Sequence, residues 1–130
     1  LVHKEVKRWQ NRGFPLSLRG YLNREEAMAL FLWADYLLLP SRIESIPVIF
    51  SDAMQTNCPL ISTPIGDLPR LMANNQAGIL ANETSPQDYS KALQKALRLS
   101  PSLFSEGIKT LQTQFDIKKT AKNLIEILLP

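Results

Sequence analysis

Two acidic side chains in the middle of the chain are the first candidates for chemistry. Glu44 follows a short apolar run, and Asp52 lies eight residues further on. An ionised carboxylate only accepts hydrogen bonds, so both residues suit the binding of sugar hydroxyls, and both would repel a phosphate group. The same spacing is also compatible with two solvated acids, one on a loop and one on the flank of a helix.

The elements around these acids predict how they are positioned. The run Tyr36–Leu39 predicts a strand, and Pro47 is suited to the first turn of a helix that continues to Met54. A helix that begins after the carboxyl end of a strand directs free N–H groups into the crevice where open α/β sheets bind ligands. We expect Glu44 at the mouth of this crevice and a diphosphate over the helix start. Asp52 should lie about 8 Å along the helix axis from Pro47.

Further apolar runs predict the rest of a sheet. Asn57 ends the central helix, Pro59–Ser62 predicts the next strand, and Gly66 breaks the loop that follows it. Leu16–Arg19 and Ala77–Leu80 predict two more strands, and each consecutive pair is joined through a helix. Such spacing is typical of right-handed parallel crossovers. The sequence therefore predicts an α/β fold, a Rossmann-like parallel sheet of about four strands with flanking helices.

Local signals mark most of the helices. Asn23 with Glu26 forms a capping-box pattern, and Ser85 and Asp116 are expected to cap two later helices. A first helix is expected over Leu1–Arg12 and a C-terminal helix over the region 119–130. Periodic apolar residues predict one buried face on each helix. Trp9 and Trp33 are expected to be core anchors rather than ligand platforms.

Composition narrows the class of protein. The 130 residues suffice for one domain, the apolar content of 45% is enough for a core, and the net charge is +3. The basic groups Lys4–Arg12 and Lys118–Lys122 are expected to be solvated helix faces, or else to contact anionic lipid, and nothing favours nucleic acid. A single cysteine, Cys58, precludes an internal disulfide and is typical of a reducing compartment. No apolar run approaches a membrane span, so we expect a cytoplasmic location, at most peripheral to the membrane.

The central motifs resemble the signature of retaining GT-B glycosyltransferases, in particular the family-four group, the glycosyl transferases group 1. That signature is a Pro-Ser pair, a Glu followed by an aromatic or aliphatic residue and Gly, a second acid in Glu-Ala-Met, Gly-x-Pro, and a Gly-rich turn before Pro-Glu. It is present here as Pro40-Ser41, Glu44-Ser45-Ile46-Pro47, Asp52-Ala53-Met54, Asn57-Cys58-Pro59 and Gly66-Asp67-Leu68-Pro69-Arg70. The resemblance extends from about Leu18 to about Leu99.

The resemblance implies a function and a set of roles. Residues 1–130 would be a single domain, a fragment of the C-terminal nucleotide-sugar-binding domain of a hexosyltransferase-type enzyme. Glu44 would be the catalytic residue that binds hydroxyls of the donor sugar, and Asp52 would bind the ribose. The remaining donor-binding positions would be Ser45, Ile46, Pro47, Val48 and Gly66. The donor is expected to be a nucleotide-diphosphate sugar, with no metal and no cofactor, and a lone His3 argues against a metal site.

The chain also departs from the family pattern. The second acid is Asp52 rather than Glu, Pro47 replaces a Gly and removes one N–H, and Asn57 replaces another Gly, a position where Asn tolerates the left-handed conformation. Arg70 stands where an acid is common. These departures indicate a divergent subgroup, for which the sequence names neither the sugar nor the base.

Parts of the resembled domain are missing from this chain. Two earlier strands, with their Gly-rich turn and basic pair, and the acceptor-binding N-terminal domain are not in the sequence. We therefore expect either that strand 16–19 pairs directly with strand 36–39, or that bare sheet edges drive association of chains into a homo-oligomer. This chain alone is expected to be catalytically silent.

Three functions remain open at this level. The first is the donor half of a glycosyltransferase, with a glycan or lipid-linked acceptor that binds through the N-terminal domain, in polysaccharide biosynthesis. The second is a non-catalytic nucleotide or nucleotide-sugar binding module with a Rossmann-like fold. The third, a receiver-like interaction domain, would need an acid cluster and a lysine that the sequence does not offer.

Overall fold

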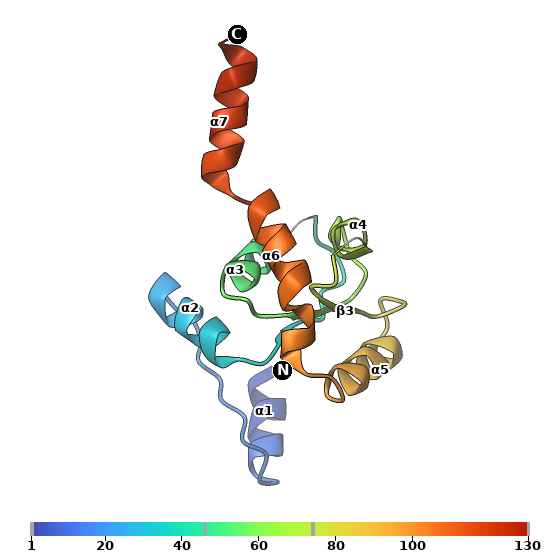
Figure 1. The fold of residues 1–130 in the computed structure, drawn as a ribbon. Coiled ribbons are helices and arrows are strands. Elements are labelled where there is room, and N and C mark those ends of the chain that lie inside the picture. Colours follow the sequence, from blue (N-terminus) through green and yellow to red (C-terminus); the bar gives the residue numbers. More distant parts are fainter. Residues whose placement is uncertain (1, 46, 74, 130) are drawn as a thin grey trace.

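The computed structural model describes residues 2–45, 47–73 and 75–129. Its helices and strands follow one another along the chain (Figure 1) in this order: α1 Val2–Gln10, α2 Arg24–Trp33, β1 Leu37–Leu39, α3 Val48–Gln55, β2 Leu60–Ser62, α4 Leu68–Ala73, β3 Gly78–Leu80, α5 Pro86–Ala96, the 3₁₀ turn η1 Pro101–Phe104, α6 Ser105–Gln114 and α7 Ile117–Leu128.

A parallel sheet with the strand order β1-β2-β3 forms the centre of the molecule. Leu38, Ile61 and Ile79 lie side by side across the three strands. The central strand β2 is buried along its whole length. Each connection from one strand to the next passes through a helix, as parallel pairing requires. The predicted α/β fold is therefore confirmed, with one strand fewer than expected.

The segment Leu16–Arg19 is not a strand, and this part of the sequence prediction was wrong. The residues that the structure describes between 14 and 22 form neither helix nor strand. The side-chain amide of Gln10 donates instead to the carbonyl oxygen of Leu16 at 2.7 Å, so the segment folds back on α1. Without a neighbouring strand, an extended segment has no ladder to stabilise it. The expected pairing with strand 36–39 is thus contradicted, and association through bare edges stays a prediction.

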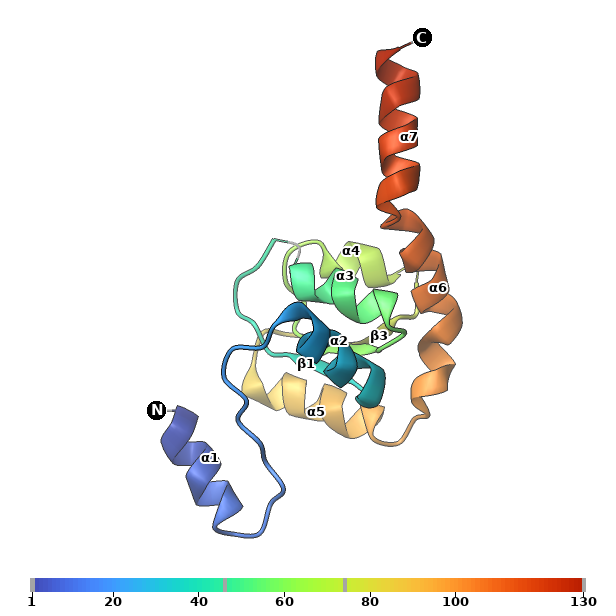
Figure 2. The ribbon, with the colours of Figure 1, turned by 90° about the vertical axis from the view of Figure 1, so that its left-hand side faces the viewer.

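The sheet lies between two layers of helices. Helix α5 covers one face of the sheet, and α3 and α4 lie on the other (Figure 2). Helices α2 and α6 both pack against α3. The largest fully buried side chains come from α3, β2, α4 and α6 and include Phe50, Met54, Ile61, Leu68 and Ile108. The core therefore surrounds the helix that carries Asp52.

The two terminal helices differ from the expectation of one buried face each. Neither α1 nor α7 has a buried residue in the part of the chain that the structure describes, and α7 projects away from the body of the molecule (Figures 1 and 2). Trp33 is 83% exposed and Trp9 is 38% exposed, so the prediction that they anchor the core was wrong. Trp9 packs locally instead, edge-on against Phe14 with a ring separation of 5.1 Å. These side chains lack a packing surface within the described chain.

Helix starts follow the local signals closely. Asn23 and Glu26 form the predicted capping box, and Ser85 and Asp116 cap α5 and α7. Helix α7 begins at Ile117, two residues before the region 119–130. Pro47 is the N-cap of α3 rather than part of its first turn, because its ψ of 125° is still extended. Among the described residues, no helix is long and apolar enough to cross a membrane.

Candidate functional site

The loop that carries Glu44 leaves the carboxyl end of β1 and leads into α3. Glu44 and Ser45 are exposed, Pro47 is buried, and Val48 is 78% exposed at the start of the helix. Ile46, a predicted donor-binding residue, lies outside the described residues. The predicted site residues of this loop are therefore presented at the sheet edge where α/β proteins bind ligands.

Gly66 lies in direct backbone contact with this loop. Its φ is +50°, and a Cβ added there would lie 1.7 Å from the carbonyl oxygen of Ser45. The N–H of Asp67 donates to the same carbonyl oxygen at 3.0 Å. Only glycine combines the positive φ with this close approach. The loop after β2 is thus in direct contact with the Glu44 loop, which brings Gly66, Ser45 and Glu44 together.

Two side chains fix the starts of the same loops. The hydroxyl of Thr63 donates to the carbonyl oxygen of Ser41, and the hydroxyl of Ser62 donates to that of Leu39 at 3.1 Å. Ser62 and Thr63 are both buried at the end of β2. These hydroxyls satisfy their hydrogen-bonding capacity at the end of the neighbouring strand and so join the ends of β1 and β2.

The start of α3 offers backbone donors to a ligand. The first N–H groups of a helix have no partner within the helix. Pro47, the N-cap, has no side-chain hydrogen bond to offer them, and no other described side chain caps this helix. The N–H groups of Val48 and Ile49 and the partial positive charge of the helix start are therefore directed to the sheet edge beside Glu44.

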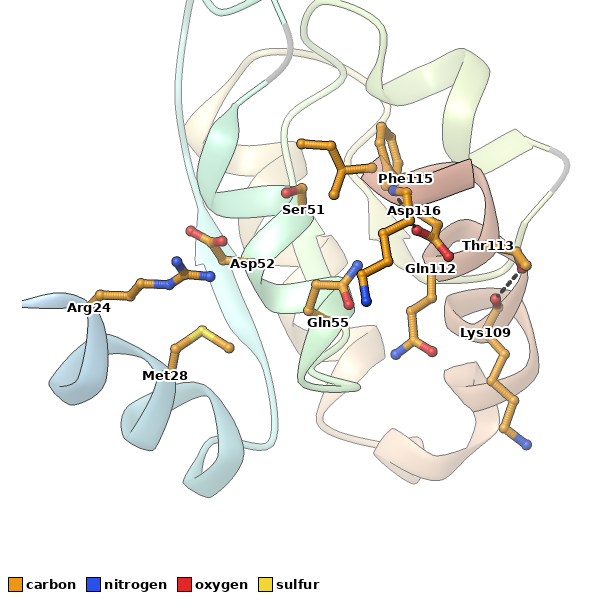
Figure 3. A pocket seen from close by; sticks show the side chains of 12 residues that line it. Arg24, Met28, Ser51, Asp52, Gln55, Lys109, Gln112, Thr113, Phe115 and Asp116 are labelled. Carbon is orange, nitrogen blue, oxygen red and sulfur yellow. Dashed lines mark hydrogen bonds between the residues drawn. The ribbon is translucent and has the colours of Figure 1, made fainter. Parts of the chain in front are cut away.

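Asp52 lies in a separate place, on the side of α3 that faces α2 and α6. It is half-buried and lines an open hollow of about 970 Å³, here called the Asp52 hollow. The lining consists of Arg24, Met28, Ser51, Asp52, Gln55, Lys109, Gln112, Thr113, Phe115, Asp116, Ile117 and Lys118. Arg24 of α2 and Asp52 point toward one another across it (Figure 3).

The Asp52 hollow does not include the rest of the predicted donor site. Within the described chain, its lining contains Asp52 but none of Glu44, Ser45, Pro47, Val48 or Gly66. The structure therefore brings the Glu44 loop, the start of α3 and Gly66 together, and leaves Asp52 further along the same helix. No group of three metal-ligating side chains occurs among the residues that the structure describes.

A second hollow of about 360 Å³ lies at the same sheet edge as Glu44 and is here called the Arg42 hollow. It is lined by Pro40, Arg42, Thr63, Thr84, Ser85, Pro86, Tyr89 and Ser90. These residues come from the ends of β1 and β2 and from the start of α5. Sequence reasoning assigned none of them a binding role, because only the packing of α5 beside the Glu44 loop brings them together.

Burial and hydrogen bonding shift the pKa values of several groups in the described chain. Hydrogen bonds from Lys91 and then from Ser85 lower the pKa of Asp88, in the first turn of α5. Burial raises the pKa of the Tyr89 phenol, whose hydroxyl donates to the Ile61 carbonyl oxygen at 3.0 Å. Burial also raises the pKa of the Cys58 thiol, which packs as an inert apolar group.

Comparison with known proteins identifies the family. The family model described as "Glycosyl transferases group 1" matches residues 14–123, which include every predicted site residue. The chain belongs to this family. The expectation of a group 1 glycosyltransferase fold and family is thereby confirmed.

Individual glycosyltransferases are similar to this chain over most of its length. The D-inositol 3-phosphate glycosyltransferase of Corynebacterium aurimucosum is 30% identical over 83 residues, 64% of this chain and 20% of the relative. That of Jonesia denitrificans is 31% identical over 97 residues, 72% of this chain and 23% of the relative. The amylovoran biosynthesis glycosyltransferase AmsK of Erwinia amylovora is 31% identical over 126 residues, 87% of this chain and 30% of the relative. The chain thus spans about a fifth to a third of the length of these group 1 glycosyltransferases.

Proposed function

We propose that this chain is the donor-binding part of a retaining GT-B glycosyltransferase of family four. The enzyme transfers a hexose from a nucleotide-diphosphate sugar to a glycan or a lipid-linked glycan acceptor. The observation that carries the proposal is the backbone contact between Gly66 and Ser45, which holds the Glu44 loop beside the start of α3. Family membership and the names of the relatives support it, and the amylovoran enzyme supports a role in polysaccharide biosynthesis.

Each part of the donor has a proposed partner. The Glu44 carboxylate accepts hydrogen bonds from hydroxyls of the sugar and orients it for transfer. The N–H groups of Val48 and Ile49 bind the diphosphate and stabilise the charge that develops on it as the sugar leaves. Because the helix start supplies this positive charge, the proposal needs neither a metal nor a cofactor. Asp52 accepts hydrogen bonds from the ribose.

Acceptor binding and sugar transfer require parts of the enzyme outside this chain. The acceptor binds through an N-terminal domain, and the chain alone binds donor without transferring sugar. A lipid-linked acceptor fits a cytoplasmic enzyme that contacts the membrane surface.

Nucleotide-sugar titration of isotope-labelled chain tests this assignment. UDP-glucose, GDP-mannose or ADP-glucose should give saturable amide shifts at Ser45, Val48 and Gly66. Glu44→Gln should weaken the binding of the nucleotide sugar about tenfold and leave the binding of the free nucleoside diphosphate unchanged, because Glu44 contacts the sugar alone. Glu126→Gln removes the same charge on α7 and serves as the control. If Glu44→Gln weakened the binding of both ligands equally, Glu44 would not be the residue that contacts the sugar.

The alternative is a non-catalytic nucleotide-sugar binding module. It is favoured by Pro47, which caps α3 without an N–H to donate. Sugar transfer by the native polypeptide separates the two functions. Under the leading proposal Glu44→Gln abolishes transfer while donor binding remains detectable, whereas a binding module shows no transfer before or after the substitution.

A further inference from the structure

Helix α7 has an apolar face that no other part of the described chain covers. All of its residues are exposed. Its large apolar side chains are between 54% and 79% exposed, and they are Ile117, Leu124, Ile125, Ile127 and Leu128. The helix extends beyond the body of the molecule, and no other described element lies alongside it in either view (Figures 1 and 2). Its apolar face is therefore open to a partner.

The sequence of α7 separates apolar from basic residues around the helix. With about 3.6 residues per turn, one side of the helix carries Ile117, Ala121, Leu124, Ile125 and Leu128. Lys118 and Lys122 follow one margin of this side, and Lys119 lies on the far side. Glu126 is the one acidic residue of the helix. Three lysines and one glutamate leave α7 with a net positive charge beside its apolar face.

The lysines of α7 are available to an anionic partner. The side chains of Lys118 and Lys119 make no ion pair with any described residue. Lys122 lies 3.8 Å from Glu126 in a pair that is exposed on both sides. A lysine at the margin of an apolar face can lay its methylene stem along that face and place its ammonium group among lipid headgroups. The charge of α7 is thus complementary to an anionic membrane surface.

Helix α1 is also basic, but its apolar side is partly covered. Trp9 packs edge-on against Phe14, and the guanidinium of Arg12 lies 4.5 Å from the centre of the Trp9 ring. Val6 lines a small hollow together with Leu16. Within the described chain, the apolar face of α7 has no such cover, so α7 is the stronger candidate for a membrane contact.

We propose that α7 binds the surface of an anionic lipid bilayer. The helix lies in the plane of the interface, with its apolar face toward the acyl chains and its lysines among the headgroups, as interfacial amphipathic helices do. A second copy of α7 fits this face less well, because pairing would bring the lysines of both helices together with one acid on each to offset them. The inference rests on the proposed function, whose lipid-linked acceptor lies in a membrane, and it names the element that contacts that membrane.

Vesicle binding by the whole chain tests the inference. Vesicles of equimolar phosphatidylglycerol and phosphatidylcholine should sediment with the protein, and pure phosphatidylcholine vesicles should bind far less of it. Binding to the anionic vesicles should weaken as salt is added, because salt screens exposed charges. In the isotope-labelled chain, the amide signals of Leu124, Ile125 and Leu128 should broaden as anionic vesicles are added, and those of Ser45 and Gly66 should shift only with nucleotide sugar.

Removal of the basic charges of α7 tests the electrostatic part. Combined Lys118→Gln, Lys119→Gln and Lys122→Gln should weaken binding to the anionic vesicles about 100-fold, because each lysine near an anionic surface contributes about fivefold. Glu126→Gln should strengthen binding about fivefold, since it removes the negative charge of the helix. A gain of binding cannot result from misfolding.

The basic residues of α1 supply the matched control. Combined Lys4→Gln, Lys7→Gln and Arg8→Gln removes the same number of positive charges from another exposed helix. This variant should bind the anionic vesicles as the wild type does. Its comparison with the α7 variant separates a contact made by α7 from general attraction of a basic protein.

A leucine substitution tests the apolar part. Leu124→Gln should weaken vesicle binding about tenfold or more, because the leucine can no longer transfer its apolar surface into the membrane. Leu103→Gln on η1 is the control, since Leu103 is 57% exposed and Leu124 is 54% exposed. It should bind the vesicles as the wild type does.

Several results would overturn the inference. Equal binding to neutral and anionic vesicles would remove the role of the lysines, and equal loss in the α1 and α7 variants would remove the role of α7. Self-association of the chain in place of vesicle binding, abolished by Leu124→Gln, would mean that a second copy covers the face. Absence of vesicle binding by the native polypeptide would mean that another part of the enzyme covers it. None of these results affects donor binding at Ser45 and Gly66, whose failure would instead contradict the proposed function.

Discussion

The backbone of Gly66 lies directly against the carbonyl oxygen of Ser45. Any other residue at position 66 would place its Cβ only 1.7 Å from that oxygen. The same oxygen accepts the N–H of Asp67. The loops that follow β1 and β2 therefore share one backbone contact, and the position of Glu44 depends on it. Gly66 acts on the site through backbone geometry and presents no chemical group of its own.

Gly66→Ala should destabilise the fold and displace the Glu44 loop. The new Cβ meets Ser45, and the alanine must also adopt a φ of +50°, so we expect a loss of about 2–4 kcal/mol in the free energy of unfolding. Urea denaturation measures this loss, and the amide shift of Ser45 reports the displaced loop.

Gly20→Ala is a matched control for that substitution. Gly20 has a φ of +70°, but no atom lies within 4 Å of the point that an alanine Cβ would occupy, so alanine there suffers the backbone strain without the collision. We expect a cost of about 1–2 kcal/mol and no change at Ser45. Equal costs at the two glycines would mean that the loops separate freely and that the contact does not position Glu44.

A second glycine contact holds α6 against the backbone of the segment before β3. A Cβ at Gly107 would lie 2.5 Å from the backbone carbonyl of Gln76. Alanine favours a helix by up to about 1 kcal/mol, but the collision is with backbone that cannot rotate away. We expect Gly107→Ala to lower the unfolding free energy by about 1–3 kcal/mol. Thr110→Ala, exposed on the same helix, should change it by less than about 0.5 kcal/mol, and a stabilised Gly107→Ala would contradict the close packing.

Helix starts were predictable because the information is local. The side chains of Asn23 and Glu26 each accept a hydrogen bond from the backbone N–H of the other. Four consecutive residues therefore contain the whole capping box. The parallel order of three strands was also predictable, since each strand is separated from the next by a helix. Asn57 adopts a φ of +58°, as its place after α3 indicated.

Burial was less predictable because it depends on distant neighbours. Trp33 ends an apolar helix, but no described element covers it. Leu16–Arg19 has the composition of a strand, yet a strand requires a partner, and its hydrogen bond goes to α1 instead. The close contact of Gly107 is equally non-local, because it is made with Gln76, which is thirty-one residues away in sequence.

Only part of the candidate site was predictable from the sequence. Glu44 and Gly66 follow neighbouring parallel strands, and the ends of such strands meet at one edge. The Arg42 hollow required the packing of α5 against β2, which no local pattern contains. Asp52 lines a hollow together with residues of α2 and α6, and this arrangement comes from packing of α3 that the spacing from Glu44 does not reveal.

Stability should depend on pH through Asp88. Its pKa is lowered in the folded state, first by the hydrogen bond from Lys91 and then by that from Ser85. A lowered folded pKa contributes stability above the unfolded value, here about 3.8, and this contribution is lost as the pH falls through the folded pKa. Urea denaturation should therefore show wild type more stable than Asp88→Asn at pH 7, with a difference that shrinks below pH 3.8.

Lys91→Ala supplies the control for this pH dependence. Removing the first partner should move the carboxyl pKa of Asp88 back toward its ordinary value, and carboxyl NMR titration measures that value directly. A carboxyl titration curve that is the same in Lys91→Ala and wild type would show that Lys91 does not act on Asp88.

The role of Asp52 is open to a test that compares two nucleotides. If its carboxylate accepts hydrogen bonds from the ribose, Asp52→Ala should weaken UDP binding about tenfold or more, because a bond to a charged group is lost. Binding of 2′,3′-dideoxyuridine diphosphate, which lacks those hydroxyls, should be unchanged by the same substitution. Calorimetric titration of both ligands into both proteins completes a double-mutant cycle.

Asp52→Glu should keep the preference for UDP, while Gln55→Ala, one turn away in the same hollow, should leave both affinities as they are. Equal weakening of the two nucleotides by Asp52→Ala would mean that Asp52 shapes the hollow without touching the ribose.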